Sequence, residues 1–518
     1  MNAQPPRSPA SSAVDVERFR LRRFLDELKE AGDLEVYSEP TELGDLAAKI
    51  TGNKKAVLFE QAGAEKLPVV GNVIGSRERM ARAFGVEPRK VMHEILRRLK
   101  TEGEVIEIPR EQAPVQQIVL TGADADLSKL PINLQHALDG GPYISAAMDF
   151  ARDPKTGWTN VGLRRCILRG KHETGIDLLS PSDLRNIYLD TLERKERLPL
   201  SIVVGSHPID YFTATMRMPI DELKLMSMLR GAPLPVVKCV TNDLMVPADA
   251  EWVIEGYLDE DGYREPEGPF GEFLGYYGHV KVNPVFHVTA ITRRKDAIFQ
   301  TISISGKAMS RTDTAQLSAH RTEVLVWRAL ELAVREPIDV FASAPTGGVY
   351  NVRISIRQKA PGESRNAIAA AFGSLANVKN VFVVDPDIDI FSDEEMDWAL
   401  GTRFQGDRDY VFASDMRCLP LDPSLEGAKM GAKAGFDLTV PYGLSGRLAT
   451  ESPAAPRYEG KRFPSLEAAL QDGPKYFEDL MAAMGTRDGR DVILLLDELR
   501  QKGRLGREIS TGRYLLEK

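Results

Sequence analysis

The feature that most constrains the fold is an alternation of apolar and polar residues in the middle of the chain. From Ile144 to Phe150 every second residue is apolar while the positions between them include Ser145 and Asp149, the turn-forming sequence Asp153-Pro-Lys-Thr-Gly157 follows, and a second strand-like pattern covers residues 158–169. Two alternating runs joined by a short turn predict a β-hairpin. We therefore predict a barrel-like, β-rich domain over residues 126–318. Its other expected elements are strands at residues 198–204, 236–240, 280–293 and 297–305, and a helix at residues 220–230.

Helical periodicity flanks this domain on both sides. On the N-terminal side, apolar residues recur at helical spacing from Phe19, and two strand-like runs and a charged helix follow. On the C-terminal side, helical spacing returns near Val324, and a strand-like run begins at Val381. We predict a small α/β domain over residues 16–125, an α/β domain over residues 319–450 and an α+β multidomain fold overall.

The two ends of the chain differ from this body. Residues 1–15 are rich in Pro and Ser, and we predict a disordered lead-in there. Residues 451–518 form a tail with amphipathic helices predicted at residues 466–484 and 492–501. Such a tail either packs on a neighbouring subunit or covers the chain's own core, and the sequence leaves both open.

Charge and cysteine content exclude several classes of protein. The chain has 67 Lys and Arg against 75 Asp and Glu, and its net charge of −8 argues against a nucleic-acid or anionic-membrane partner. The three cysteines are widely scattered, so we expect no disulfide framework and a cytoplasmic location. Because no long apolar run occurs, neither a secretory signal nor a transmembrane helix is expected.

The most unusual stretch is Pro266-Glu-Gly-Pro-Phe-Gly-Glu-Phe-Leu-Gly-Tyr-Tyr277. It places Glu267 and Glu272 five residues apart on a segment whose Gly and Pro residues exclude a regular helix. If both carboxylates face inward, burial and their mutual repulsion would hold one protonated, while an arginine would keep the other ionised. Such a pair can act as a general acid. The alternative is an exposed turn with two solvated glutamates.

A second polar group lies in the predicted strand Trp158-Thr-Asn-Val-Gly-Leu-Arg-Arg-Cys166. Arg164 and Arg165 interrupt this half-apolar strand, and adjacent arginines in such a place need anionic partners. The alternative is that Arg164 faces solvent and Arg165 makes a structural ion pair. Glu222, near the start of the expected 220–230 helix, reads on its own as a surface carboxylate.

Together these stretches resemble the UbiD family of decarboxylases, over roughly residues 18–445. The resemblance implies a homo-oligomer, dimeric or hexameric, with a split β-barrel middle domain like that of flavin reductases. It also implies prenylated FMN as the cofactor, which a flavin prenyltransferase supplies. The motifs that carry it are Glu267-Gly-Pro-Phe-Gly-Glu272, Thr159-Asn160 followed by Arg165, Val237-Lys-Cys-Val-Thr-Asn-Asp-Leu-Met-Val-Pro247 and Lys433-Ala-Gly-Phe-Asp-Leu-Thr439.

The same resemblance assigns roles to individual residues. Arg165, Glu267 and Glu272 match a catalytic Glu-Arg-Glu network in which Glu272 returns a proton to carbon after CO₂ leaves. A divalent metal, typically Mn²⁺, is implied at Asn160, Glu222 and a third position, where Asp183 replaces the family's histidine and Ser182 stays open. K⁺ is a further candidate ion. The implied cofactor contacts are Asn160, Gly162, Leu163, Arg164, Arg165, Glu222 and Lys433.

The implied reaction is a reversible, non-oxidative decarboxylation of an aromatic or α,β-unsaturated carboxylic acid, which includes CoA-linked acids. The alternative is a flavin oxidoreductase or a flavin-binding module on the same barrel. Two glutamates beside an arginine favour the decarboxylase, because hydride transfer needs no such proton donor. One geometric difficulty is that Asn160 and Arg165 are an odd number of residues apart, so on a regular strand their side chains would point to opposite faces. We therefore expect a bulge or a strand end between them.

Overall fold

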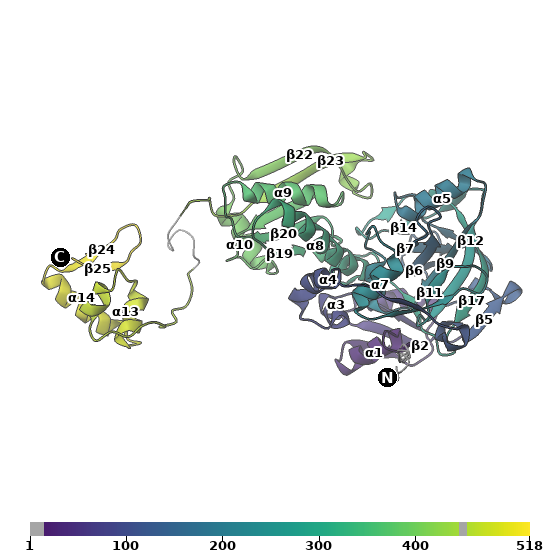
Figure 1. Ribbon diagram of the computed structural model, residues 1–518, viewed down its shortest axis with the longest axis horizontal. Coiled ribbons are helices and arrows are strands. Elements are labelled where there is room, and N and C mark those ends of the chain that lie inside the picture. Colours follow the sequence, from purple (N-terminus) through teal and green to yellow (C-terminus); the bar gives the residue numbers. More distant parts are fainter. Residues whose placement is uncertain (1–14, 445–452, 518) are drawn as a thin grey trace, which may run out of the picture.

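The computed structural model describes residues 15–444 and 453–517 (Figure 1). The expected lead-in, apart from Asp15, lies outside the described residues. The N-terminal region holds a four-stranded sheet in the order β1-β2-β3-β18. Strand β18 follows the barrel strands in the chain and pairs parallel with β3, so this sheet draws on the segment expected to belong to the middle domain. The elements of this region are α1 (Leu21–Glu30), β1 (Leu34–Tyr37), α2 (Leu43–Ile50), β2 (Ala56–Ala62), β3 (Leu67–Gly71), α3 (Arg77–Phe84), α4 (Val91–Arg98) and β18 (Phe299–Thr301).

Six antiparallel strands close into a barrel in the middle of the chain (Figure 1). Their order is β12-β9-β6-β7-β8-β17, and β12 also pairs with β17, which closes the sheet. The expectation of a barrel-like middle domain is confirmed. A further strand, β5, pairs with β17. The strands are β5 (Ile118–Thr121), β6 (Tyr143–Arg152), β7 (Thr159–Leu168), β8 (Glu173–Ile176), β9 (Leu198–Val204), β12 (Trp252–Leu258) and β17 (Val285–Arg293).

The expected hairpin is formed by β6 and β7, and its turn has a local cause. The Asp153 carboxylate accepts a hydrogen bond from the Lys155 N–H at 2.8 Å, which closes an Asx-type turn. Gly157 adopts a φ of +75°, a conformation that suits glycine better than other residues. The turn chemistry therefore fixes where the hairpin reverses.

Shorter elements surround the barrel. Strand β10 lies between β11 and β4, β13 pairs with β16, and β14 pairs with β15. The expected strand over residues 280–293 is wrong in one respect, because it is divided at Pro284, which has no N–H to donate to a strand ladder. The strand expected at residues 297–305 is reduced to β18. The elements are β4 (Val105–Glu107), α5 (Asp183–Glu193), α6 (Pro208–Thr213), α7 (Glu222–Arg230), β10 (Leu234–Lys238), β11 (Met245–Pro247), β13 (Glu265–Glu267), β14 (Phe270–Gly271), β15 (Tyr277–Gly278) and β16 (Lys281–Asn283).

A five-stranded sheet with helices forms the C-terminal domain, as an α/β architecture requires. The strand order is β19-β20-β21-β23-β22, and α9 packs against both β21 and β23. The elements are α8 (Asp313–Ala333), β19 (Pro337–Ala342), β20 (Asn351–Ile356), α9 (Glu363–Ser374), β21 (Asn380–Val384), α10 (Asp393–Arg403), β22 (Tyr410–Arg417) and β23 (Met430–Asp437).

The tail forms a small unit with an apolar core of its own. The single helix expected at residues 466–484 is wrong, because the chain breaks at Gly473 and Pro474. Gly473 has a φ of +135°, and Pro474 cannot donate a helical hydrogen bond. The elements are α12 (Leu466–Gln471), α13 (Phe477–Met484), α14 (Gly489–Gln501), β24 (Leu505–Arg507) and β25 (Tyr514–Leu516).

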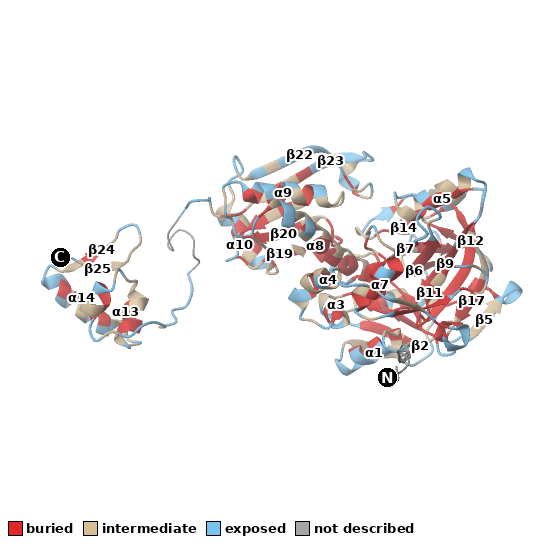
Figure 2. Ribbon diagram, viewed as in Figure 1, coloured by how far each residue is buried: buried red, intermediate tan, exposed pale blue. Residues whose placement is uncertain are grey.

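Buried residues follow the barrel strands and the inner faces of the helices that cover them (Figure 2). Strand β6 is buried along almost its whole length, which places the adjoining strand β7 deep in the molecule. Among the described residues, no helix is both long and apolar enough to cross a membrane.

Candidate active site

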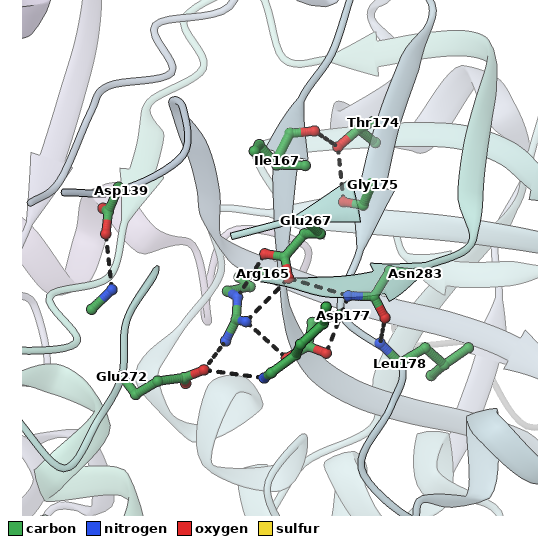
Figure 3. Close-up of polar contacts among 12 residues, drawn as sticks. Asp139, Arg165, Ile167, Thr174, Gly175, Asp177, Leu178, Glu267, Glu272 and Asn283 are labelled. Carbon is green, nitrogen blue, oxygen red and sulfur yellow. Dashed lines mark hydrogen bonds and ion pairs between the residues drawn. The ribbon is translucent and has the colours of Figure 1, made fainter. Parts of the chain in front are cut away.

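The guanidinium of Arg165 on β7 lies at the centre of a buried network of charged side chains (Figure 3). We call this group the acid–arginine network. The residues of the group are Arg165, Asp177, Glu267, Glu272, Lys281 and Asn283.

Three carboxylates contact this one arginine. Arg165 Nε and Nη2 donate to the two oxygens of Glu267 at 3.0 and 3.2 Å, a bidentate pair. Arg165 Nη1 donates to Glu272 Oε1 at 2.9 Å, and Nη2 lies 3.0 Å from Asp177 Oδ2. Burial alone would lower the pKa of Arg165, but Asp177, Glu272 and Glu267 outweigh burial and raise it. The arginine therefore stays charged, and the three groups singled out in the sequence meet in space.

Lys281 and Asn283, on β16, complete the network. Lys281 Nζ lies 3.2 Å from Glu272 Oε1 and 3.3 Å from Asp177 Oδ2, so it joins the two carboxylates that Arg165 also joins. Asn283 Nδ2 donates to Glu267 Oε2 at 3.1 Å. Burial would raise the pKa of Asp177, yet Arg165 and Lys281 lower it.

Sequence reasoning missed Asp177, Lys281 and Asn283. A usable signal was present, since Lys281 and Asn283 are polar residues two apart on a strand, and strand residues two apart share a face. Their partner is set by the antiparallel pairing of β13 with β16, in which Glu267 lies opposite Lys281. That pairing is not visible in the sequence.

The segment from β13 to β15 carries both glutamates and is held in place by several contacts. The Arg165 guanidinium lies over the ring of Phe270. Its central carbon, Cζ, is 4.5 Å from the centroid of that ring. The Asp139 carboxylate accepts from the Gly271 N–H at 2.8 Å, which ties the loop to the chain before β6. At Gly278, a Cβ atom would lie only 2.6 Å from Glu272 Oε1, so glycine lets that carboxylate pack against the backbone. These contacts bury Glu267 to 1% and Glu272 to 6% exposure.

A second cluster begins at Asn160, near the start of β7. We call it the amide–carboxylate cluster, and it consists of Asp149, Asn160, Arg164, Ser182 and Glu222. Glu222 Oε2 accepts from Asn160 Nδ2 at 3.1 Å and from the Val161 N–H. Arg164 Nη2 donates to Ser182 Oγ at 3.1 Å, and Arg164 Nε lies 3.7 Å from Asp149 Oδ2.

Helix α7 delivers Glu222 to this cluster from its first position. Asp221 caps the helix by accepting from the Leu223 N–H at 2.9 Å, and its other oxygen accepts from the Thr159 N–H at 2.9 Å. One aspartate therefore starts the helix and fastens it to β7. Glu222 is buried at 5% exposure, so reading it as a surface carboxylate would have been wrong.

Several oxygens of this cluster lack partners. In the described part of the chain, Asn160 Oδ1 and both carboxylate oxygens of Asp149 are buried without a hydrogen-bond partner. Burial, and to a smaller extent the nearby Asp149 carboxylate, raise the pKa of Glu222 to about 8, although the hydrogen bond from the Val161 N–H opposes them. Asp149 faces the Arg164 guanidinium at 3.7 Å but accepts no hydrogen bond from the described residues, and buried carboxylate and amide oxygens of this kind are the ligands that a hard divalent cation prefers.

No group of three or more His, Cys, Asp or Glu side chains in the described residues is arranged as a metal site, so a cation here would depend on the amide of Asn160. Asp183 points its carboxylate to Arg217, with oxygen–nitrogen distances of 2.9 and 2.8 Å. Ser182, the other candidate, already lies in the cluster through Arg164.

A pocket of about 500 Å³ opens beside the amide–carboxylate cluster. This volume falls in the range of small-molecule sites. The lining includes Asn160, Asp183 and Glu222 together with the basic side chains Lys155 and Arg217. Both basic side chains are already paired with carboxylates of the lining, Lys155 with Asp190 and Arg217 with Asp183, so the candidate cation would have to balance the charge of a ligand phosphate here.

The remaining residues expected at the cofactor are placed as follows. Gly162 lies opposite Asp149 in the β6–β7 ladder, and a Cβ there would come within 2.8 Å of the Asp149 carboxylate. Leu163 is partly buried against the main core. Lys433 lies on β23 and donates to the Phe372 and Leu375 carbonyls, at 2.9 and 3.0 Å, at the C-terminal end of α9. Burial lowers the pKa of Lys433 to about 8, and its role at a cofactor stays a prediction.

The expected irregularity near Arg165 is present, but it lies in the partner strand. Between Ile144 and Ala147 of β6 the register shifts, so that two residues of β6 face the single residue Arg165. The side chains of Asn160 and Arg165 nevertheless enter the two different clusters.

Three family models match the chain. They describe the N-terminal, Rift-related and C-terminal domains of 3-octaprenyl-4-hydroxybenzoate carboxy-lyase, and match residues 25–99, 106–308 and 317–438. Anhydromevalonate phosphate decarboxylase from Methanosarcina mazei is 32% identical over 422 residues, which is 81% of this chain and 95% of that protein.

Solved structures agree with these matches. The UbiD-class enzyme HmfF from Pelotomaculum thermopropionicum, in complex with FMN, has a TM-score of 0.77 and 34% identity, covering 86% of this chain and 97% of that one. An evolved dimeric form of HmfF has been solved in complex with prFMN. The apo 3,4-dihydroxybenzoic acid decarboxylase from Enterobacter cloacae has a TM-score of 0.76 and 25% identity, covering 84% and 96%.

Proposed function

The chain belongs to the UbiD family of carboxy-lyases, and from that premise we propose that it decarboxylates an aromatic or α,β-unsaturated acid with prenylated FMN, using Glu272 as the proton donor. The observation that carries the role of Glu272 is the difference between the two glutamates. Both oxygens of Glu267 are engaged, by Arg165 and Asn283. The ion pairs of Glu272 in the described part of the chain both use Oε1, which leaves Oε2 to carry a proton.

The charge of the acid–arginine network also favours proton storage. With every group ionised, the three carboxylates exceed the cations Arg165 and Lys281 by one negative charge. In a site of low dielectric such an excess is costly, and one proton removes it. Glu272 can hold that proton and give it to the carbon from which CO₂ has left, and solvent then returns a proton to the network.

The cofactor assignment rests on the amide–carboxylate cluster and its pocket. Prenylated FMN, when bound, would supply the sink for the electron pair that remains after CO₂ leaves. Asn160 and Glu222 would hold a divalent cation, Mn²⁺ in our proposal, and Arg164 would bind the phosphate. Asp183 is proposed as the third ligand, which requires it to leave Arg217, and Ser182 is the alternative. The structural neighbours bound to FMN and prFMN support this assignment.

The substrate is proposed only as a class. The relatives named above act on chemically different acids, an anhydromevalonate phosphate in one case and 3,4-dihydroxybenzoic acid in another. We keep aromatic and α,β-unsaturated acids, including CoA-linked ones, because both types allow an electron sink to form next to the departing carboxylate. The dimeric neighbour supports a homo-oligomeric enzyme.

The test is CO₂ release by the full chain produced together with a flavin prenyltransferase. A panel of aromatic and α,β-unsaturated acids, extended by anhydromevalonate phosphate, is assayed with wild type, Glu272→Gln and the control Glu265→Gln. We expect release from at least one acid with wild type and the control, and loss of turnover in E272Q with flavin still bound by absorbance. Wild-type turnover in E272Q would show that Glu272 is not the proton donor. Flavin-loaded wild type that releases CO₂ from no acid, but reduces or oxidises its flavin with a substrate, would favour the oxidoreductase.

A further inference from the structure

The tail at residues 453–517 is a separate unit beyond the family matches, the last of which ends at residue 438 (Figure 1, yellow). Its elements run α12, a short bridge at Lys475, α13, α14, β24 and β25, the order of a winged helix. Lys475 pairs with Tyr514 of β25, and β25 pairs with β24. Helices α13 and α14 are joined by residues 485–488, a turn as short as that of a helix-turn-helix.

The unit keeps its own apolar core but leaves apolar side chains outside it. Val492, Leu496 and Leu499 turn one side of α14 into that core. On the other side, Ile493 is 51% and Leu494 67% exposed. Two large aliphatic residues next to each other on an exposed helix face indicate a contact surface.

The charges of this unit argue against nucleic acid as the partner. Residues 453–517 contain equal numbers of basic and acidic side chains, eleven of each. The second helix of a helix-turn-helix enters the major groove in DNA-binding proteins, where phosphates require a basic face. Here that helix exposes Asp491 and Glu498 beside its apolar residues.

The exposed face of α14 carries opposite charges at its two ends and aliphatic residues between them. Arg490, Ile493, Leu494 and Asp497 are spaced i, i+3, i+4 and i+7, so they share one face of the helix. The Arg490 side chain is 88% exposed and that of Asp497 is 37% exposed. Reversing the helix exchanges the positive end for the negative end and Ile493 for Leu494, so the face is complementary to itself.

We propose that α14 pairs antiparallel with α14 of a second copy of this chain, about a two-fold axis between residues 493 and 494. Ile493 packs on Leu494 of the partner subunit, and Arg490 faces the partner's Asp497. A two-fold axis makes each contact twice, as an isologous interface requires. In the single chain, Arg490 forms an ion pair with Asp488, and Asp497 forms one with Arg500. On pairing, each of these intrachain ion pairs is replaced by an ion pair with the partner subunit.

One helix pair is small compared with the interfaces of permanent dimers, which bury about 1,200 Å² or more. We therefore expect weak pairing when the units meet freely, and stronger pairing when the bodies of two chains are already held together, because linked contacts raise each other's effective concentration. The inference concerns residues outside the proposed active site and does not depend on the reaction.

The test is site-specific cross-linking of full-length chains. A chain with Arg490→Cys is mixed with a differently tagged chain carrying Asp497→Cys, and a short thiol cross-linker is added. The natural cysteines Cys166, Cys239 and Cys418 are buried and give a low background. The matched control replaces D497C by D491C, because Asp491 is exposed on α14 but turned away from the pairing face. We expect mixed dimers from R490C with D497C at about tenfold the yield of the control.

The charges are tested in the same assay, because a mixed dimer keeps one native pair between Asp497 of the R490C chain and Arg490 of the D497C chain. Adding D497K to the first chain, or R490E to the second, makes this pair repulsive and should lower the yield about fivefold. Adding both restores attraction and should restore the yield. Equal yields for D497C and D491C, or yields unaffected by the charge changes, would overturn the proposal. So would binding of a labelled random DNA duplex that R490E weakens, which would assign the face to nucleic acid.

Discussion

Replacing Glu222 by Gln tests how the amide–carboxylate cluster balances its charge. Glu222 is 5% exposed, and burial raises the pKa of its carboxyl from 4.5 to about 8. A folded chain that holds a proton more tightly than the unfolded chain loses stability as the pH rises from the unfolded pKa to the folded one. For the metal-free wild type, the contribution of Glu222 to stability should therefore fall between pH 4.5 and about 8.

The size of this loss follows from the same pKa values. Each pKa unit corresponds to about 1.4 kcal/mol, so ionised Glu222 costs the folded metal-free chain about 5 kcal/mol above the folded pKa. At pH 5 the cost is about 1 kcal/mol and at pH 8 about 4 kcal/mol. Gln has nearly the same shape, carries no charge and keeps an acceptor for the Val161 N–H. The free energy of unfolding of E222Q minus that of wild type should therefore grow by about 3 kcal/mol from pH 5 to pH 8.

The assay is urea unfolding of both proteins in EDTA, followed by circular dichroism at matched pH values. Taking the difference cancels the titration of the rest of the chain. Glu60→Gln, at an exposed position, is the control and should show no growth of the difference with pH. Mn²⁺ at pH 8 should stabilise wild type but not E222Q, because a ligand stabilises only the state that binds it. A difference between E222Q and wild type that stays constant with pH would mean that burial does not hold Glu222 neutral, and the reasoning would be wrong.

The other predictions concern the two clusters directly. Gly278→Ala should lower turnover about tenfold or more without loss of flavin, because the new Cβ atom displaces the Glu272 carboxylate; unchanged kcat would contradict this placement. Lys281→Gln should lower kcat about tenfold, since a charged hydrogen bond is worth about 1.5–3 kcal/mol, and Lys281→Arg should recover most of it. Asp183→Ala should weaken Mn²⁺ binding, measured by calorimetry, more than Ser182→Ala does; the reverse order would assign the third ligand to Ser182.

Features with a local cause could be predicted from the sequence. The hairpin of β6 and β7 was predictable because Asp153 and Gly157 make the turn by themselves. The break at Pro474 also has a local cause, and its signal was present but outweighed by the amphipathic pattern on either side. Strand β12 gave no alternating signal, because nearly all of its residues are buried, Glu255 included, so its sequence does not separate an exposed face from a buried one.

The acid–arginine network was predictable only in part. The motif around Glu267 and the resemblance to a family led to Arg165, but nothing local to Asp177 marks it as a partner of Arg165, and nothing local to Lys281 marks it as a partner of Glu272. Their positions depend on which strands pair and in which register. Contacts between segments about a hundred residues apart cannot be predicted from either segment alone. The same holds for Asp149, which lies opposite Gly162 through the β6–β7 ladder.

Strand β7 connects the two clusters, and its register decides which side chain enters each of them. Asn160 contacts Glu222 in one cluster, and Arg165 contacts Glu267 in the other. A slip of one residue along β6 would turn each side chain to the opposite face and remove the arginine from its three carboxylates. The bulge in β6 opposite Arg165 opposes such a slip, because two residues of β6 fit against one residue of β7 at only one place. The bulge therefore acts on function through register, since it keeps Arg165, which contacts the proposed proton donor Glu272, and Asn160 of the proposed cation site in separate clusters along one strand.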